Sequence, residues 1–244
     1  MSMLTTTLKQ VEFANAIVAL KDGVTKKQIQ RIVGFMRKAG DQSSRRLAAN
    51  GVPDSADSVE PLYLERLGLV VGLVDSGQVA NIRAVGAAAR VAGAPEISLI
   101  RPIRGKGVSA ADSGDEKAKS AANWGIEALG IARLHGMGLS GKQIKIGHLD
   151  TGVDPSHPRF GKGAIAGWLE TDHTGKAVED SEPYDDDGHG THTAGTIAGR
   201  DLKGLPKIGA APGASLYVAK CIEGQGVHNR VLASFEWAAS NECR

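Results

Sequence analysis

Two residues of this sequence stand where an α/β protein places reactive side chains. Asp150 ends the apolar run 144–149, which predicts a strand, and α/β folds gather their sites at the carboxyl ends of such strands. His189 opens a run of small residues, 190–199, which predicts a helix that approaches other backbones closely. An aspartate and a histidine so placed suit a general base and its orienting carboxylate. The pair would still need a nucleophile.

Other chemistry is conceivable at the same residues. An isolated Asp-Thr-Gly is equally explained by an aspartate that caps the turn after a strand. Asp187, His189 and His192 would suit a metallohydrolase, because residues i and i+3 of a helix share a face. The neighbouring Asp-Thr-Gly block at 150–152 speaks against that interpretation.

A phosphate-binding loop is the third alternative. Gly136 to Lys142 matches its glycine and lysine spacing, but Gln143 stands where Ser or Thr should be. The motif also requires a strand before it and a helix after it, whereas this sequence predicts the reverse order. We therefore reject a nucleotide-hydrolysing function.

The N-terminal part predicts the order βαββαβ, a ferredoxin-like split arrangement. One helix should begin at the capping box Thr25 to Gln28 and stop at Gly40, before a polar loop, and a second should open at Asp75 and close at Gly93 and Pro95. The strands are expected at residues 13–20, at 62–74 as a pair that turns at Gly68, and at 97–103.

A change of composition marks a second domain. Residues 105–120 are rich in Gly, Ser, Ala, Asp and Lys, which is typical of an exposed linker. We place the domains at 8–105 and 121–244, with 106–120 as the linker. Helices at 126–135, 189–198 and 230–239 and strands at 144–149 and 216–220 predict a parallel α/β sheet. Another strand would be expected after residue 244, so we expect this domain to be incomplete.

Composition excludes several classes of function. The 244 residues, 41% hydrophobic, carry 29 basic and 27 acidic side chains, and a net charge of +2 argues for neither nucleic acid nor an anionic membrane as a partner. No stretch reaches the ~18 apolar residues of a membrane helix, and residues 1–5 lack signal-peptide features, so we expect a cytoplasmic location by default. Cys221 and Cys243 are expected to be reduced thiols.

Two longer blocks resemble a known family. Asp150 to Asp154 with His157-Pro158, and Gly188 to Thr196, are similar to the aspartate and histidine blocks of the subtilisin-like serine proteases, the subtilase or peptidase S8 family. Further similar stretches are Asn123 to Ile126, Gly209 to Ala214 and Phe235 to Ala238. The N-terminal domain, as in Ala16 to Val24, resembles the family's propeptide, which acts as an intramolecular chaperone and inhibitor.

The resemblance implies a serine endopeptidase precursor whose substrate is a polypeptide. Asp150 would be the triad aspartate and His189 the triad base, while His192 resembles a packing residue of the same helix. Gly224, Gln225 and Gly226 resemble the stretch that binds extended substrate as an added strand.

The sequence departs from the family pattern at the nucleophile. The Gly-Thr-Ser block, the oxyanion Asn and the Ser-Leu-Gly strand have no counterpart before Arg244, and Ser140 and Ser215 are expected at the wrong ends of their strands. We therefore expect the chain as given to be inactive. The alternative is a non-enzymatic, propeptide-like inhibitor or chaperone.

A second departure concerns calcium. Where the family often has a calcium-binding aspartate after the His-Pro pair, this sequence has Arg159, so we expect no metal or other cofactor there. The acidic run 179–187 could bind calcium instead, but a solvated loop is favoured.

Overall fold

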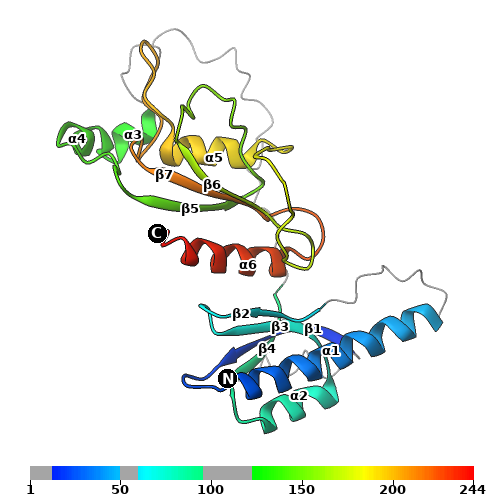
Figure 1. The fold of residues 1–244 in the computed structure, drawn as a ribbon. Coiled ribbons are helices and arrows are strands. Elements are labelled where there is room, and N and C mark those ends of the chain that lie inside the picture. Colours follow the sequence, from blue (N-terminus) through cyan, green and yellow to red (C-terminus); the bar gives the residue numbers. More distant parts are fainter. Residues whose placement is uncertain (1–12, 50–59, 96–122) are drawn as a thin grey trace. The chain divides into compact units, whose positions relative to one another are not determined.

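The computed structural model describes residues 13–49, 60–95 and 123–244, which fall into two compact units (Figure 1). The first comprises the chain up to Ile97 with the later segments Asp172–Lys176 and Gly226–Glu236. The second comprises the remaining residues, Ser98–Thr171, Ala177–Gln225 and Trp237–Arg244. Of the helices in the described ranges, none combines the length and apolar character that crossing a membrane requires.

The first unit contains a four-stranded antiparallel sheet with two helices on one side of it (Figure 1). The sheet order is β2-β3-β1-β4, and the chain order is β1, α1, β2, β3, α2, β4. The bounds are β1 Phe13–Leu20, α1 Lys26–Ala49, β2 Leu62–Leu64, β3 Leu69–Asp75, α2 Ser76–Ala84 and β4 Ala88–Gly93.

Alternating strand residues and one face of each helix form the core of this unit. Ala16 and Val18 of β1 are fully buried against Ile32 and Met36 of α1 and Ile82 of α2. Successive strand residues point to opposite faces, so residues two apart pack on the same helices. The apolar residues at every second position of the strands therefore form the face of the sheet that the helices cover.

The structure confirms the start of α1 and corrects its end. The Thr25 backbone N–H donates to Gln28 Oε1 at 3.0 Å, and the Gln28 N–H donates to Thr25 Oγ1 at 3.3 Å, which is the predicted capping box. The helix does not stop at Gly40 but continues to Ala49, where a polar loop was expected. A glycine costs a helix only about 1 kcal/mol, and good helix formers such as Leu47 and Ala48 follow.

The end of α2 was also predicted wrongly, and the strand β4 that follows it was not predicted. Asp75 caps α2 as expected, since its carboxylate accepts the Gln78 N–H at 2.6 Å. The helix ends at Ala84, because Gly86, with φ of 77°, takes the left-handed conformation that terminates helices. Residues 88–93 then form β4, an alanine-rich strand with little intrinsic β preference. The strand predicted at 97–103 and the linker at 106–120 lie outside the described residues.

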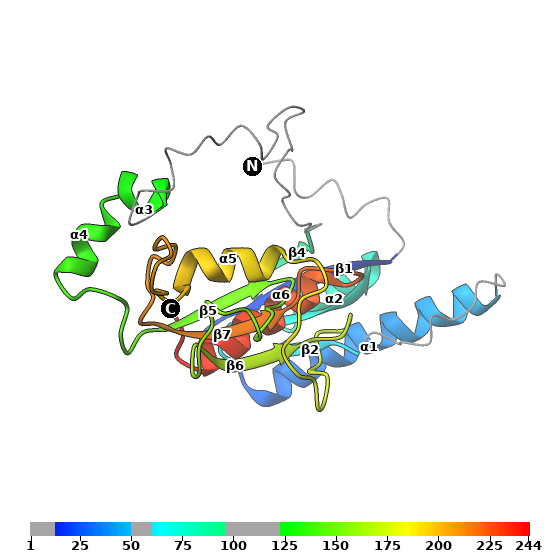
Figure 2. The same cartoon turned by 90° about the horizontal axis from the view of Figure 1, so that it is seen from above.

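The second unit contains a parallel sheet of three strands in the order β5-β7-β6, seen side by side in Figure 2. The predicted parallel α/β architecture is thereby confirmed. The strand β6 was not predicted, and Gly130, with φ of 68°, divides the single helix expected at 126–135 into two. The bounds are α3 Trp124–Ala128, α4 Ile131–Gly136, β5 Lys145–Asp150, β6 Ile165–Glu170, α5 His189–Ala198 and β7 Ser215–Lys220. The last helix, α6 Val227–Ser240, belongs to the first unit up to Glu236 and to the second unit from Trp237.

The register of this sheet brings the reactive residues together. Asp150 at the end of β5 pairs with Lys220 at the end of β7, and Lys145 pairs with Ser215 at the opposite end. The helix α5 lies along one face of the sheet (Figure 1), where Ala194 and Ala198 pack with Leu216 and Val218. The N-terminus of α5 therefore meets the carboxyl end of β5.

Candidate active site

Asp150 and His189 form a direct contact at the carboxyl edge of the parallel sheet. His189 Nδ1 lies 2.6 Å from Asp150 Oδ1, within hydrogen-bond distance. Asp150 is 6% exposed, whereas the His189 side chain is 23% exposed. The carboxylate is thus enclosed, while the imidazole reaches solvent on its other side.

Two glycines allow this approach. A Cβ atom on Gly190, the second residue of α5, would overlap the backbone of Gly152 in the loop after β5. Gly152 itself has φ of 125°, and a Cβ atom there would overlap the Tyr184 carbonyl. The glycines of the Asp-Thr-Gly and His-Gly-Thr sequences are therefore required for the contact between strand end and helix start.

Neighbouring donors hold the Asp150 carboxylate in place. The Thr151 backbone N–H donates to Oδ1 at 2.8 Å, and Thr193 Oγ1, one turn into α5 from His189, lies 3.0 Å from Oδ2. Hydrogen bonds of this kind favour the ionised form of a carboxylate and fix its orientation.

Asp185 organises the loop that precedes α5. Its carboxylate accepts hydrogen bonds from Thr151 Oγ1 at 2.9 Å, from the Gly188 N–H at 3.0 Å and from the Thr191 N–H at 2.8 Å. Burial acts to raise the pKa of Asp185, but these bonds and one from Thr191 Oγ1 outweigh it and lower the pKa to about 2. Asp185 thus joins the loop after Asp150 to the helix that carries His189.

The sequence predictions treated Asp185 only as part of an acidic run. Nothing in the sequence distinguishes Asp185 from its neighbours Asp186 and Asp187, because the residue at the cap position is Gly188. Gly188, the residue at the cap position itself, has no side chain with which to accept these N–H groups.

Lys220 is a fully buried cation beside the same loop and was not predicted. Its Nζ donates to the Thr151 carbonyl at 2.8 Å and lies 2.8 Å from Glu223 and 3.6 Å from Asp186. It also lies 4.4 Å from the centre of the Tyr184 ring. A buried charge persists only where such partners replace water. No sequence pattern distinguishes this lysine from a surface one.

The predicted strand-addition stretch is irregular in the structure. Gly224 and Gln225 form bends after β7, Gly226 follows them just before α6, and both glycines have positive φ, 67° and 68°. Gly224 and Gln225 are exposed. Their part in binding a peptide stays a prediction.

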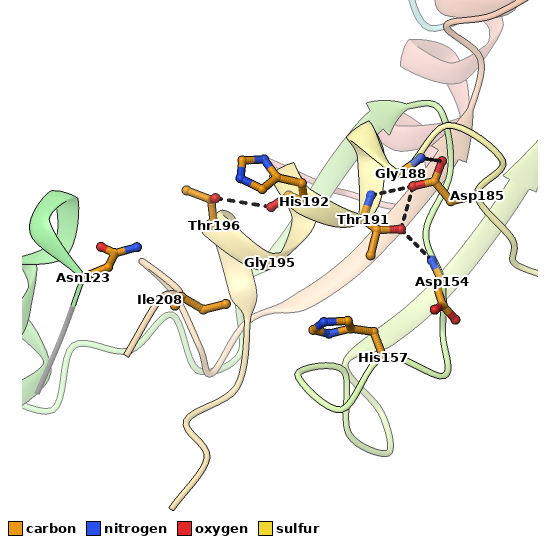
Figure 3. Close-up of a pocket in the computed structure, with 10 residues that line it drawn as sticks. All are labelled: Asn123, Asp154, His157, Asp185, Gly188, Thr191, His192, Gly195, Thr196 and Ile208. Carbon is orange, nitrogen blue, oxygen red and sulfur yellow. Dashed lines mark hydrogen bonds between the residues drawn. The ribbon is translucent and has the colours of Figure 1, made fainter. Parts of the chain in front are cut away.

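A cavity of about 520 Å³ lies beside α5 (Figure 3). His192, Gly195 and Thr196 of α5 line it, together with His157 and Ile208. Neither Asp150 nor His189 belongs to its lining. His192, expected as a packing residue, is exposed.

The side chain of Arg159 contacts two backbone carbonyls. Arg159 is 6% exposed, and its guanidinium donates to the carbonyls of Arg200 at 3.0 Å and Pro206 at 2.9 Å. Carbonyl oxygens are the ligands that calcium would need, and the side chain that occupies them is itself positive. Within the described ranges, no three or more His, Cys, Asp or Glu side chains converge as for a metal ion.

Comparison with known proteins finds relatives for the C-terminal part of the chain. Residues 141–244 match the family model described as the subtilase family. Subtilisin E of Bacillus subtilis (strain 168) is 34% identical over 121 residues, which are 48% of this chain and 29% of that protein. The major intracellular serine protease of the same organism is 38% identical over 113 residues, 46% of this chain and 33% of that protein. The chain spans about a third of the length of these relatives.

A solved structure shows the same fold. The crystal structure of fervidolysin from Fervidobacterium pennivorans, a keratinolytic enzyme related to subtilisin, aligns with 94% of this chain and 34% of its own, with a TM-score of 0.55 and 22% identity. Identity at that level supports the fold alone. The family match and the sequence relatives show more: residues 141–244 of this chain are similar in sequence to the subtilase family.

Proposed function

We propose that this chain supplies the acid–base half of a subtilisin-like serine endopeptidase, in precursor form. The observation that carries the proposal is the 2.6 Å contact between Asp150 Oδ1 and His189 Nδ1. Because Asp150 is hydrogen-bonded to Nδ1 of His189, the second ring nitrogen, Nε2, is available for proton transfer. Among the described residues Nε2 of His189 has no hydrogen-bond partner, and its ring is partly exposed.

This geometry suits general-base catalysis of acyl transfer. Asp150 holds the neutral imidazole as the Nδ1–H tautomer, which leaves a lone pair on Nε2. Nε2 would take the proton of an attacking serine hydroxyl and later return it to the leaving amine of a polypeptide. Asp150 would stabilise the imidazolium that forms between these two steps.

Neither Ser140 nor Ser215 is placed to be that nucleophile. Ser140 packs against Gly213 before β5, so the strand that ends at Asp150, about 16 Å long, lies between it and the site. Ser215 pairs with Lys145 at the same far end of the sheet. We therefore propose that these 244 residues alone do not hydrolyse peptides.

Two experiments test this function. The chain as given should turn over no casein and should not react with a serine-directed phosphonate probe. The same chain fused to the serine-bearing segment of subtilisin E should hydrolyse peptide, and His189→Ala should abolish that activity. His192→Ala, three residues along α5 and without contact to Asp150, is the matched control. Probe labelling of the unextended chain would contradict the proposal.

A second candidate function belongs to the first unit, for which we propose a ferredoxin-like, propeptide-like inhibitor or chaperone. The order β2-β3-β1-β4 supports it. Within this unit, the Glu236 carboxylate accepts the backbone N–H groups of Arg66 at 2.8 Å and Leu67 at 3.0 Å. A chain that slows a mature subtilisin without itself being cleaved would support this candidate, and rapid cleavage without inhibition would oppose it.

We also propose that Arg159 takes the place of a cation in the loop 200–206. The support is that its guanidinium already occupies the two carbonyl oxygens. Calorimetric titration of the chain with calcium should show no tight binding that depends on Asp154 or the carbonyls near Arg159.

A further inference from the structure

We propose that His148 is a positioning residue for Asp150 and acts on it through the hydroxyl of Thr193. The inference deepens the proposed function, because it adds a buried second histidine behind the Asp150–His189 pair. His148 lies two residues before Asp150, so both side chains stand on the same face of β5. It is 5% exposed, and the general-base step described above does not use it.

Four side chains are connected in one line. His148 Nε2 lies 2.9 Å from Thr193 Oγ1, and Thr193 Oγ1 lies 3.0 Å from Asp150 Oδ2. The other carboxylate oxygen, Oδ1, meets His189 Nδ1 at 2.6 Å. Asp150 therefore stands between two histidines, one bonded directly and one through a threonine.

Hydrogen-bond accounting gives the direction of this relay. Thr193 Oγ1 carries one hydrogen, and its possible acceptors are Asp150 Oδ2 and, at 3.1 and 3.2 Å, the His189 and Gly190 carbonyls. The carboxylate is the strongest of these acceptors, because it is charged. The threonine oxygen is then free to accept a hydrogen bond from His148 Nε2–H.

The opposite direction would be more costly. If Thr193 donated to His148, the ring hydrogen would sit on Nδ1, which is buried and has no partner among the described residues. A buried donor without a partner costs more than a buried nitrogen lone pair. Asp150 Oδ2 would also lose its donor. The geometry therefore favours His148 Nε2–H to Thr193 and Thr193 O–H to Asp150.

The charges around His148 favour its neutral form. Burial lowers the pKa of His148 most, Asp150 and Asp185 act to raise it, and His189 lowers it further. His148 Nε2 and Asp150 Oδ2 are 3.7 Å apart, and Thr193 lies against both. A neutral His148 does not compete as a second cation with the imidazolium of His189 for the charge of Asp150.

The relay has a consequence for His189. Donation from Thr193 holds Oδ2, so that Oδ1 faces His189 Nδ1, and it also withdraws part of the negative charge from the carboxylate. Loss of that donor concentrates charge on Asp150 and stabilises the His189 imidazolium. Removal of the Thr193 hydroxyl should therefore raise the pKa of His189.

Nitrogen-15 NMR of the imidazole rings in the 244-residue chain tests the relay without any turnover. In the wild type, His148 should be neutral at pH 7 with its hydrogen on Nε2. Thr193→Val, which keeps the side-chain volume, should raise the pKa of His189 and mix the His148 tautomers. His148→Leu should raise the pKa of His189 by a smaller amount.

Thr196→Val is the matched control. Thr196 lies one turn further along α5, its hydroxyl donates to the His192 carbonyl at 3.2 Å, and it does not contact Asp150. This variant should leave both titrations unchanged. His148→Leu also keeps the test decisive if Thr193→Val fails to fold, as judged by circular dichroism.

Two results would overturn the relay: a wild-type His148 with its hydrogen on Nδ1, or a His189 titration that neither Thr193→Val nor His148→Leu moves. Failure of the proposed function looks different. In that case the fused chain would remain inactive, while the NMR titrations still showed the relay.

Discussion

The two sheets of this protein bury different kinds of side chain. Behind the antiparallel sheet, the core is apolar, with Val18, Ile32, Met36 and Ile82 excluded from water. At the carboxyl end of the parallel sheet, the buried side chains include His148, Asp150 and Lys220. The first arrangement gains stability from the apolar area that it removes from water. The second requires a specific partner for every charge.

This difference teaches where each part tolerates change. An apolar core accepts another hydrophobic residue of similar volume at modest cost. A buried charge network does not, because removal of one member leaves the others without a partner. Substitutions in the two regions should therefore differ in how much stability they cost, and the reverse order of costs would contradict the comparison.

The largest expected effect is a cavity in the apolar core. Ile32→Ala should destabilise the first unit by about 2 to 5 kcal/mol, because Ile32 is fully buried and its contacts cannot be replaced by water. Hydrogen exchange of the β1 amides, measured by mass spectrometry, should become faster by the corresponding factor. Ile32→Val is the control and should cost about 1 kcal/mol.

Loss of the Arg159 guanidinium should have the next largest effect. Arg159→Met keeps the apolar stem but leaves the buried carbonyls of Arg200 and Pro206 without these donors. We expect a cost of about 2 to 3 kcal/mol in the second unit. Tryptophan fluorescence can measure it, because Trp124, Trp168 and Trp237 all lie in that unit. Full recovery on adding calcium would show that a cation can replace the guanidinium.

Loss of the Asp185 carboxylate should have a smaller effect on the stability of folding, and this effect should depend on pH. Its pKa in the folded chain, about 2, is below the ordinary value of 3.8, so its contribution to stability is present above about pH 5 and is lost as pH falls towards 2. The shift corresponds to about 2 kcal/mol, but solvent screening of this partly exposed group reduces it to about 1 kcal/mol. Asp185→Asn should be less stable than wild type at pH 7 and equally stable near pH 2, by urea unfolding.

The smallest effect is expected for a surface ion pair of the first unit. Arg37 Nη2 and Glu60 Oε2 are 2.9 Å apart, but both side chains are about half exposed. Solvent screens such pairs, so Glu60→Gln should leave the thermal midpoint unchanged. A clear fall in the midpoint would mean that surface charge contributes more to this unit than the comparison allows.

Much of the fold could be predicted from the sequence, because many helices and strands carry strong local sequence signals. The apolar spacing of Ile29 to Met36, the capping residues Thr25 and Asp75 and the small residues after His189 each indicated the element that the structure shows. Weak signals failed, as in the alanine-rich β4. The glycine at position 40 also misled, because Gly40 lies inside α1 and does not adopt the left-handed backbone of a helix-terminating glycine.

The site was predictable to a lesser extent. Asp150 and His189 were found because the end of a strand and the start of a helix can be predicted from the sequence. The structure places these two residues in contact. Their catalytic role remains a proposal. Lys220, Asp185 and the His148–Thr193 contact were missed, since they depend on which side chains tertiary packing brings within 3 Å. Such proximity has no local sequence signal.

The central claim is that Asp150 holds His189 as a base with a free Nε2, and the ring nitrogens of His189 test it most directly. Nitrogen-15 shifts of the 244-residue chain at pH 8 should show a neutral His189 with its hydrogen on Nδ1. Asp150→Asn should move that hydrogen to Nε2 or mix the two tautomers. A wild-type His189 that carries its hydrogen on Nε2, unchanged by Asp150→Asn, would contradict the account.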